Sequence, residues 1–460
     1  MTRIEAPVPV IARELAQSIA DAGGRLLVVG GWVRDALRGA PSKDLDLEVF
    51  GLDTSAVESI VAPHGFTPPV GRQFPVWRHT REGLDIGLPR GGSDRSDDLA
   101  SAFARAARAR DLTVNAMGFD PLEGEVLDPF GGQRDLADRR LRAADDATFG
   151  EDPLRVLRVA RLAALLEATP DDALTTLCRA LDLTALPPER LAQELERILL
   201  TLPAPWRAIE WLDRLGQLDV FPPIAALRDV PQDPEWHPEG DVFVHTGMVV
   251  DRAASLARDL ALDPEDQAIL LWSALCHDVG KPDTTVIGED ERVRSPGHDR
   301  LSAEIAREWL GSLRLGGRRI DAIDVLVHHH LAPALFVGGG AKAKGYRRLA
   351  RKLAAGGMTP VDLERVARAD HLGRTTPEAL AGRFDEGDLF LTRAREAFVE
   401  HGPTTDVVRA ATLMRRGIEP GPELGRLLAR AREIQDDTGE TDEDAIAERV
   451  LAERAPSGEP

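Results

Sequence analysis

The stretch LLVVGGWVRDALRGAPSKDLDLEVFG, residues 26–51, decides the fold of the N-terminal part of this chain. Its first four residues form an apolar run that indicates a short buried strand. Gly30 and Gly31 follow and allow a tight turn in which the backbone approaches other groups closely. We expect residues 32–37 to form a helix whose N-terminus faces this turn, a position that favours a bound phosphate.

The end of the same stretch places two carboxylates on one side of a second predicted strand. Residues 43–50, KDLDLEVF, alternate polar and apolar side chains, which is the pattern of a half-buried strand. Because residues i and i+2 share a face, Asp44 and Asp46 point away from the core side occupied by Leu45 and Leu47. Mg²⁺ prefers one or two carboxylates together with substrate phosphates. The pattern therefore favours a site for a metal-bound triphosphate, and its alternative is an exposed strand face beside an ordinary turn.

Composition and charge limit the class of protein. A length of 460 residues suggests roughly three domains, and a hydrophobic content of 43% is ample for packed cores. No apolar run approaches the ~18 residues of a membrane span, the N-terminus has no signal-peptide core, and the two cysteines form no metal or disulfide pattern. We therefore expect a cytoplasmic protein with no membrane partner. The composition does not predict an oligomeric state.

The net charge of −20 argues against broad electrostatic attraction to nucleic acid, but a local basic patch is compatible with it. The segment AKAKGYRRLARK, residues 341–352, has six positive residues and no acid. It is the candidate for contact with a phosphate backbone, and its alternative is a solvated helix face.

The character of the chain changes along its length. Up to about residue 145, strand-like runs such as GLDIGLP and LTVNAMGF alternate with helical segments, and the later sequence has helical spacing almost throughout. The Pro- and Asp-rich stretch 222–241 is interpreted as a linker. These patterns predict an α+β multidomain protein with a mixed-sheet head followed by all-α regions.

Several short segments, taken together and in their order along the chain, resemble the motifs of a known family. They are GGWVRD (30–35), DLD (44–46), RDLTVNAM (110–117), LDPFGGQRDL (127–136), EDPLRVLR (151–158), ERLAQEL (189–195) and GIEPGPELG (417–425). Together they resemble the class II tRNA nucleotidyltransferases, the family of CCA-adding enzymes and bacterial poly(A) polymerases, here followed by an HD domain. The implied parts are a polymerase-beta-like catalytic head (1–145), a helical neck that binds nucleotide and RNA (146–232), an HD domain (235–384) and a helical tail (385–460).

The resemblance implies addition of C, or of C and A, from CTP and ATP to the 3′ end and acceptor arm of tRNA, without a nucleic-acid template. Asp44 and Asp46, with Asp85 from the run LDIGLPR, would hold two Mg²⁺ ions for phosphoryl transfer. Family members often have Glu at the place of Asp85. The nucleotide would be bound by residues of three motifs, namely Gly30, Gly31, Arg34, Arg110, Asp111, Asn115, Asp152, Arg155 and Arg158.

Base choice without a template requires the protein to read the base. Asp152 and Arg155 are three residues apart, so we expect them to share a helix face. An Asp acceptor beside an Arg donor matches the polar edges of both C and A, whereas G and U would leave buried groups unpaired. The alternative is that Asp152 interacts with a helix N-terminus and that the arginines form a solvated stripe.

Two departures from the family pattern keep the subtype open. Ala109 stands where the family usually has another arginine before Arg110. The segment 87–110 is shorter than the flexible loop carried at this place by relatives that add the whole CCA. Addition of CC alone therefore stays a serious subtype. The sequence is also compatible with a poly(A) polymerase of the same family, or with a non-polymerising, RNA- or nucleotide-binding regulator that has HD hydrolase activity.

A second set of residues resembles the H…HD…D pattern of HD phosphohydrolases. It consists of His245, the pair His277 and Asp278, and Asp370, with His298 and His328 as candidates to extend the shell. Imidazole and carboxylate ligands together suit a divalent ion, including transition metals. Such an ion activates water against a phosphoester. The alternative is a set of unrelated surface histidines.

Overall fold

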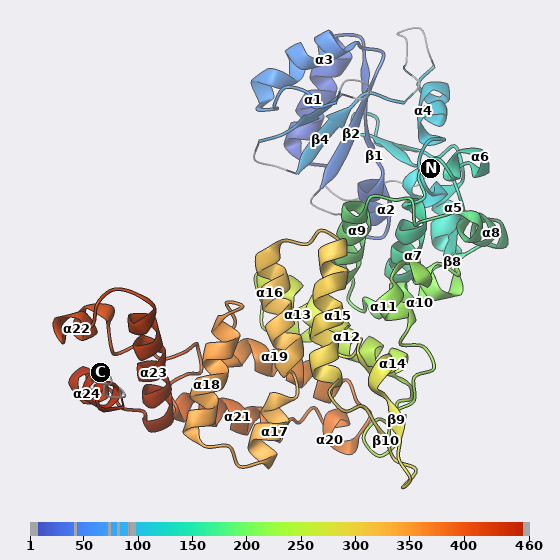
Figure 1. Ribbon diagram of the computed structural model, residues 1–460. Coiled ribbons are helices and arrows are strands. Elements are labelled where there is room, and N and C mark those ends of the chain that lie inside the picture. Colours follow the sequence, from blue (N-terminus) through green and yellow to red (C-terminus); the bar gives the residue numbers. More distant parts are fainter. Residues whose placement is uncertain are drawn as a thin grey trace. The chain divides into compact units, whose positions relative to one another are not determined.

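The computed structural model describes residues 8–453 apart from 41–43, 72–74, 81–82, 91 and 93–97. The chain forms two compact units. Unit 1 comprises residues 1–186 and 207–220, and unit 2 comprises residues 187–206 and 221–460. The predicted α+β class is confirmed, because a mixed sheet lies in unit 1 and the rest is mainly helical (Figure 1).

Unit 1 is built on a six-stranded mixed sheet. In spatial order its strands are β3 (Val76–Arg78), β4 (Leu84–Gly87), β2 (Leu45–Phe50), β1 (Arg25–Val29), β5 (Gly118–Asp120) and β6 (Glu125–Leu127). The predicted succession of strand, turn, helix and strand is confirmed, with α2 (Gly31–Leu37) between β1 and β2. Lys43, the first residue of the predicted second strand, lies outside the described residues.

Alternation along β1 and β2 separates two apolar faces of the sheet. Leu45, Leu47 and Val49 belong to a cluster that also holds buried residues of α1 (Val10–Asp21) and α3 (Thr54–Val61). Val29 belongs to a second cluster, which includes Phe103 of α4 (Leu99–Ala107). Asp46 pairs with Val29 across the two strands, so its side chain lies on the face that carries α4.

The run LTVNAMGF, residues 112–119, is a strand only at its end. Gly118 begins β5, whereas Thr113–Asn115 forms a short 3₁₀ helix. The Thr113 hydroxyl donates to Asp135 at 2.6 Å and the Asn115 amide donates to Asp111 at 3.0 Å. These side-chain bonds hold a local turn in place of the expected strand.

The other helices of unit 1 follow the sheet in sequence. They are α5 (Gly132–Ala137), α6 (Asp146–Phe149), α7 (Arg155–Leu166), α8 (Asp172–Ala180) and α10 (Trp206–Arg214), whose first residue belongs to unit 2. Within the segment expected to be one neck, α7 and α8 belong to unit 1, while α9 (Pro188–Thr201) belongs to unit 2. The four-part division of the chain stays a prediction.

The central helix of unit 2 is α13 (Pro264–Cys276). Residues 268–276 are all buried, as expected for a helix that is apolar all round. It contacts α9, α12 (Val242–Asp259), α15 (His298–Ser312), α16 (Gly317–His329) and α19 (Pro360–Leu372). His277 and Asp278 follow directly after this helix, so they too are buried in unit 2.

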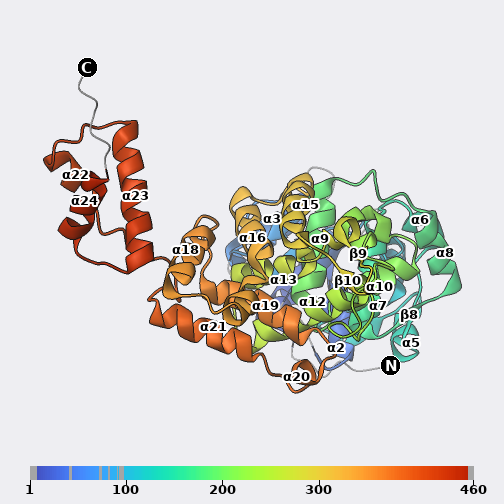
Figure 2. The ribbon, with the colours of Figure 1, turned by 60° about the horizontal axis from the view of Figure 1, so that its bottom comes forward.

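The remaining elements of unit 2 are short or C-terminal. They are α11 (Pro222–Ala225), α14 (Lys281–Thr284), β9 (Val286–Ile287), β10 (Val293–Arg294), α17 (Ala332–Gly338), α18 (Ala343–Ala354), α20 (Pro377–Leu380) and α21 (Asp385–Glu396). The last helices, α22 (Ala410–Arg415), α23 (Pro422–Thr438) and α24 (Glu443–Ala452), lie together in Figure 2. They share a small apolar cluster.

The stretch 222–241, expected to be a linker, folds into unit 2. It begins with α11, and the carboxylate of Asp241 accepts hydrogen bonds from the backbone N–H groups of Asp229 (2.9 Å) and Val244 (2.8 Å). Asp241 is thereby the N-cap of α12. Proline and aspartate in this stretch serve turns and a helix cap, which sequence composition does not distinguish from a flexible connection.

One described segment, Gly317–Gly338, is long and apolar enough to cross a membrane by composition alone. It covers α16 and α17, and its residues Ile323, Leu326 and Val327 are buried in unit 2. This is the behaviour of a core helix.

Candidate active sites

The predicted carboxylates of unit 1 gather at the ends of two parallel strands. Asp44 directly precedes β2, and Asp46 on β2 is the register partner of Asp85 on β4. Burial raises the pKa of Asp46, Arg110 lowers it, and the neighbouring carboxylates Asp85, Glu48 and Asp44 raise it further. A divalent cation would relieve this repulsion, so the donor set fits the Mg²⁺ ions that the resemblance implies.

Glycines allow the backbone to come close to these carboxylates. A Cβ atom at Gly30 would lie 3.6 Å from Asp46 Oδ2 and 3.0 Å from Arg110 Nη1, and the φ angle of Gly30 is +77°. A Cβ atom at Gly83 would lie 2.7 Å from Asp44 Oδ1. The turn after β1 therefore lies against the carboxylate group, as the sequence predicts.

Arg110 is oriented by a residue that the sequence pattern did not single out. Its Nη2 donates to Glu48 Oε1 at 2.8 Å, and Glu48 is two residues beyond Asp46 on the same face of β2. Arg110 Nε and Glu48 Oε2 are buried without a hydrogen-bond partner. Unsatisfied polar atoms beside a carboxylate cluster fit a site that is completed by a charged ligand.

Four predicted nucleotide-binding residues form one polar chain, made of two hydrogen bonds and one ion pair. Arg34 donates through Nη1 to Asn115 Oδ1 at 2.6 Å, and Asn115 Nδ2 donates to Asp111 Oδ1 at 3.0 Å. Arg158 Nη1 lies 3.9 Å from Asp111 Oδ2. The buried guanidinium of Arg34 also makes two 2.8 Å hydrogen bonds to Asp35. The charge of Arg34 is thus compensated, and its evident role is to fix Asn115.

The expected shared helix face of Asp152 and Arg155 is wrong. Helix α7 begins at Arg155, and Asp152 precedes it, accepting a hydrogen bond from the backbone N–H of Leu154 at 3.2 Å. The reason is Pro153, because the residue before a proline is disfavoured in helical conformation.

Arg155 is almost fully buried, and burial lowers its pKa. Its Nη1 donates to the carbonyl of Thr148 at 2.8 Å and its Nη2 to the carbonyl of Ala109 at 2.6 Å. Arg155 therefore anchors the backbone directly before Arg110.

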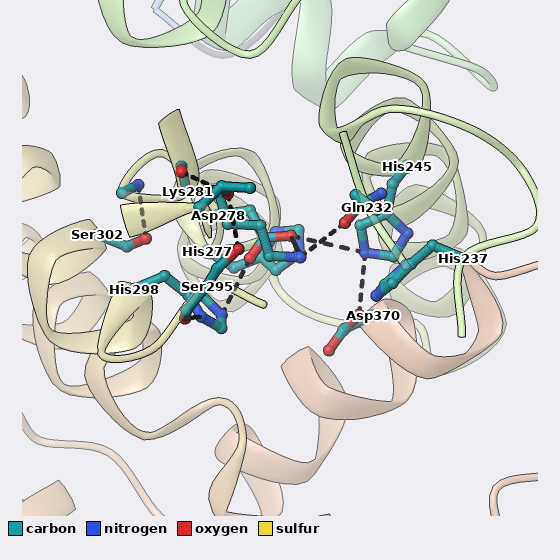
Figure 3. A network of polar contacts seen from close by, with 12 residues as sticks. Gln232, His237, His245, His277, Asp278, Lys281, Ser295, His298, Ser302 and Asp370 are labelled. Carbon is teal, nitrogen blue, oxygen red and sulfur yellow. Dashed lines mark hydrogen bonds and ion pairs between the residues drawn. The ribbon is translucent and has the colours of Figure 1, made fainter. Parts of the chain in front are cut away.

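Unit 2 contains the second cluster. Its members are buried and come from five elements or their ends, namely His245 of α12, His277 and Asp278 after α13, His298 at the start of α15, His330 after α16 and Asp370 of α19. Figure 3 labels all of these except His330. The structure thus brings together all four residues of the predicted HD pattern and adds His298, as expected.

His330 takes the place expected for His328. The ring of His330 lies 5.4 Å, between centroids, from both His277 and His298. The ring of half-buried His328 contacts His329 instead. Successive residues differ by about 100° around a helix, so the run of three histidines can direct only one toward the cluster, and its identity depends on where α16 ends.

Each imidazole of this cluster is held by a hydrogen bond at Nδ1. Nδ1 donates to the carbonyl of Ala274 in His277 (2.8 Å), of Ser295 in His298 (2.7 Å) and of Val327 in His330 (2.7 Å). In His245 it donates to the carboxylate of Glu239 at 2.8 Å. This pattern leaves Nε2 of the neutral ring as the nitrogen that can bind a metal.

Electrostatics in the cluster also suit a cation. Burial alone would raise the pKa of Asp278, but His277, Lys281 and His298 hold it well below its usual range. Burial lowers the pKa of His330 to about 4. Asp278 Oδ2 lies 3.0 Å from His277 Nε2 and 2.7 Å from Lys281 Nζ, and Asp278 Oδ1 lies 3.3 Å from His298 Nε2. Buried imidazole and carboxylate atoms so close together fit a divalent metal.

The segment before α12 supplies supporting residues that sequence reasoning missed. Glu239 Oε1 accepts hydrogen bonds from His237 Nδ1 at 2.9 Å and from His245 Nδ1 at 2.8 Å. Gln232 Oε1 accepts from Lys281 Nζ at 2.8 Å. The available signal was the presence of His237 and Glu239 shortly before His245, but both residues lie within the stretch 222–241 that was interpreted as a linker.

The basic segment 341–352 has a role that neither interpretation predicted for its arginines. Arg351 pairs with Asp436 and Asp406, both at 2.6 Å, and Arg348 pairs with Asp437 at 2.6 Å. These arginines of α18 bind acidic residues of the tail within unit 2. They are therefore not available as free charges for a phosphate backbone.

Two family models and a relative of similar length match this chain. Residues 90–142 match the family model of the poly A polymerase head domain, and residues 242–374 match that of the HD domain. The chain is 35% identical over 426 residues to the multifunctional CCA protein of Halorhodospira halophila, which covers 88% of this chain and 94% of that protein.

Solved structures show the same fold. The chain resembles a CCA-adding enzyme in apo form I with a TM-score of 0.61 at 19% identity, covering 97% of this chain and 94% of that one. It also resembles the CCA-adding enzyme of Thermotoga maritima, solved with tRNA, with a TM-score of 0.58 at 18% identity and 98% coverage of both chains.

Proposed function

Because this chain belongs to the family of the multifunctional CCA proteins, we propose that it extends the 3′ end of tRNA with C and A from CTP and ATP, without a nucleic-acid template. The carboxylates Asp44, Asp46 and Asp85 beside Arg110 carry this proposal, because they combine ligands for Mg²⁺ with a cation for phosphate. The tRNA would be held by its acceptor arm. The protein would act as a soluble cytoplasmic enzyme.

Each group of unit 1 has a defined task in this proposal. Asp44, Asp46 and Asp85 would hold Mg²⁺, which supplies activation of the RNA 3′-hydroxyl and neutralisation of the triphosphate. Gly30 and Gly31 let the backbone approach the phosphates, and Glu48 holds Arg110 beside them.

The chain Arg34–Asn115–Asp111–Arg158 would fix the ribose side of the nucleotide, because Asp111 and Asn115 present hydrogen-bonding groups in locked orientations. Asp152 and Arg155 stay the proposed base-selecting pair on the strength of the EDPLR motif. With two donors of Arg155 bonded to backbone carbonyls, its contact with a base would use its remaining N–H groups.

Incubation with tRNA that lacks its 3′ end tests this function directly. With CTP and ATP together the proposal expects three added nucleotides, C, C and A. Addition that stops after CC in the presence of ATP would identify the CC-adding subtype. Long A tracts on unstructured RNA would identify a poly(A) polymerase.

We propose a metal-dependent phosphohydrolase site in unit 2 as a second function. The observation in its favour is the buried cluster in which ligand atoms of His245, His277 and Asp370 lie within 4.8 Å of one another, with Asp278 Oδ2 3.0 Å from His277 Nε2. A divalent ion held there would supply an activated water for attack on a phosphoester. Release of phosphate from mononucleotides and opening of cyclic nucleotides, assayed with added Ni²⁺, Mn²⁺ or Mg²⁺, test this function.

A further inference from the structure

The side chain of Arg110 lies beside two carboxylates of one strand. Asp46 and Glu48 are residues i and i+2 of β2, so both point to the face of the sheet that carries α4. Neighbours of this kind along a strand are roughly 7 Å apart. The guanidinium of Arg110 is therefore attracted to both carboxylates.

The neighbouring strand β4 treats the two carboxylates differently. The register partner of Glu48 on β4 is Gly87, so this strand places no side chain opposite Glu48. The register partner of Asp46 is Asp85, so Asp46 faces another carboxylate. Glu48 is the carboxylate that accepts the hydrogen bond from Arg110 Nη2, at 2.8 Å. Asp46 and Asp85 are the arrangement that suits a divalent cation.

Arg110 nevertheless stays close to Asp46. Arg110 Nη1 and Asp46 Oδ2 lie 3.0 Å and 3.6 Å from one point, the position that a Cβ atom of Gly30 would take. The side chains of Arg110 and Glu48 are only 20% and 17% exposed, so solvent screens these charges weakly. A guanidinium released from Glu48 would form a charge-assisted hydrogen bond with Asp46. It would then occupy an oxygen that Mg²⁺ needs.

The backbone at Arg110 is held on both sides of the residue. Arg155 Nη2 donates to the carbonyl of Ala109 at 2.6 Å, and the N–H of Arg110 donates to the carbonyl of Ala107 at 3.0 Å. The choice between the two carboxylates is therefore made by the Arg110 side chain alone, and it depends on which acceptor is present.

We propose that Glu48 is a positioning residue that holds the Arg110 guanidinium away from Asp46 and so keeps Asp46 available to Mg²⁺. This inference rests on the proposed nucleotide addition by unit 1 and deepens it. Glu48 uses one N–H group of Arg110 and leaves Nη1, beside the turn after β1, for the triphosphate. Glu48 thus assigns the arginine to the phosphates and the magnesium to the carboxylates.

Two other roles for Glu48 give different results. Its carboxylate could bind the metal directly, or it could attract the metal through its charge alone. Both of these roles are independent of Arg110, whereas the proposed role acts only through Arg110. Glu48→Ala, Arg110→Ala and the double variant therefore separate the three explanations.

The measurement is Mn²⁺ binding to the full chain without nucleotide or tRNA, followed by the electron paramagnetic resonance signal of free Mn²⁺. All proteins carry His277→Ala and Asp278→Ala, so that the cluster of unit 2 does not contribute. Glu48→Ala is expected to weaken Mn²⁺ binding about 10- to 100-fold, as is typical when a residue that supports a metal ligand is lost. Arg110→Ala should bind Mn²⁺ at least as tightly as the parent. Adding Glu48→Ala to Arg110→Ala should change the affinity by no more than about twofold.

The matched control is Glu125→Ala, which removes an exposed carboxylate from β6 of the same sheet. It should leave Mn²⁺ binding unchanged. Thermal unfolding checks that each variant is folded. Glu48→Gln, which keeps the shape of the side chain and removes its charge, replaces Glu48→Ala in the same set of variants if Glu48→Ala does not fold.

A second readout is the Mg²⁺ concentration that gives half-maximal CTP incorporation into tRNA. It should rise in Glu48→Ala, and excess Mg²⁺ should restore the rate. Equal loss of Mn²⁺ affinity on Glu48→Ala with and without Arg110, or no loss in Glu48→Ala, would overturn the proposal. The Mn²⁺ measurements need no tRNA, so failure of the unmodified chain to extend tRNA would refute the proposed function and leave the test of Glu48 intact.

Discussion

His245 Nδ1 donates a 2.8 Å hydrogen bond to Glu239 Oε1, and His245 Nε2 lies 3.1 Å from Asp370. The other carboxylate oxygen of Glu239 accepts a hydrogen bond from the backbone N–H of Thr375 at 3.1 Å. Glu239 is almost fully buried. A carboxylate from the segment before α12 thus fixes the ring of a candidate metal ligand, and the loop after α19 fixes the carboxylate.

Glu239→Ala is expected to weaken metal binding in unit 2 about 10- to 100-fold, the range typical for loss of a partner that orients a metal-binding histidine. Titration with Co²⁺, followed by calorimetry and by the visible absorbance of the bound ion, measures this. Glu235→Ala is the control, because Glu235 belongs to the same segment but is exposed and paired with Arg292. Equal affinity in both variants would show that Glu239 does not orient His245.

Arg155→Ala is expected to destabilise unit 1 by about 2 kcal/mol, because the part-buried carbonyls of Thr148 and Ala109 lose their charged donor. Thermal unfolding checks this against Arg134→Ala, which removes an exposed arginine of α5. Unchanged stability of Arg155→Ala would contradict the anchoring role.

Asp152→Ala should leave stability nearly unchanged but admit U and G, if Asp152 reads the base. Incorporation of each of the four nucleotides by this variant is the measurement. Selectivity equal to that of the unmodified chain, at equal rate, would place base reading elsewhere.

Gly30→Ala is expected to abolish most nucleotide addition. A Cβ atom there would meet Arg110 Nη1 at 3.0 Å and would require a backbone conformation unfavourable for alanine. Gly39→Ala shares the positive φ angle, +74°, but its Cβ atom would have open space. It should cost roughly 1 kcal/mol of stability and spare activity. Similar activity loss in both variants would mean that backbone strain alone, and not the contact with Arg110, explains the effect.

Local patterns predicted the elements that position the candidate carboxylates of unit 1. Alternating polarity indicated which side of β2 carries Asp46, and a Gly pair after an apolar run indicated where β1 ends and α2 begins. Both depend on neighbours within a few residues. The partnership of Arg110 with Glu48 joins residues 62 positions apart, and the sequence pattern alone did not indicate it.

The wrong expectations for Asp152 and His328 have one physical cause, because the sequence pattern did not show at which residue a helix begins or ends. Pro153 shifted the start of α7 past Asp152, and the end of α16 selected His330 over His328. The stretch 222–241 folds into unit 2 and places Glu239 against His245 of the candidate metal site, although the same composition is typical of a linker. The short segment that favours the CC-adding subtype is residues 87–110. Of these, 91 and 93–97 lie outside the described residues.

The two sites are expected to act independently. His277→Ala combined with Asp278→Ala removes candidate ligands of unit 2 only, so it should abolish phosphoester hydrolysis and spare CTP incorporation into tRNA. Both assays are run on the same preparation. Loss of both activities in a folded variant would indicate one shared site.

The central claim is that the carboxylates at the ends of β2 and β4 catalyse template-independent extension of tRNA. The most direct test compares the unmodified chain with Asp46→Asn on tRNA lacking its 3′ end, with labelled CTP and ATP and with Mg²⁺. We predict extension by the unmodified chain and at least a thousandfold slower extension by Asp46→Asn with unchanged thermal stability, roughly the loss of about 4 kcal/mol of transition-state stabilisation. Extension by Asp46→Asn at a rate near that of the unmodified chain would contradict the claim.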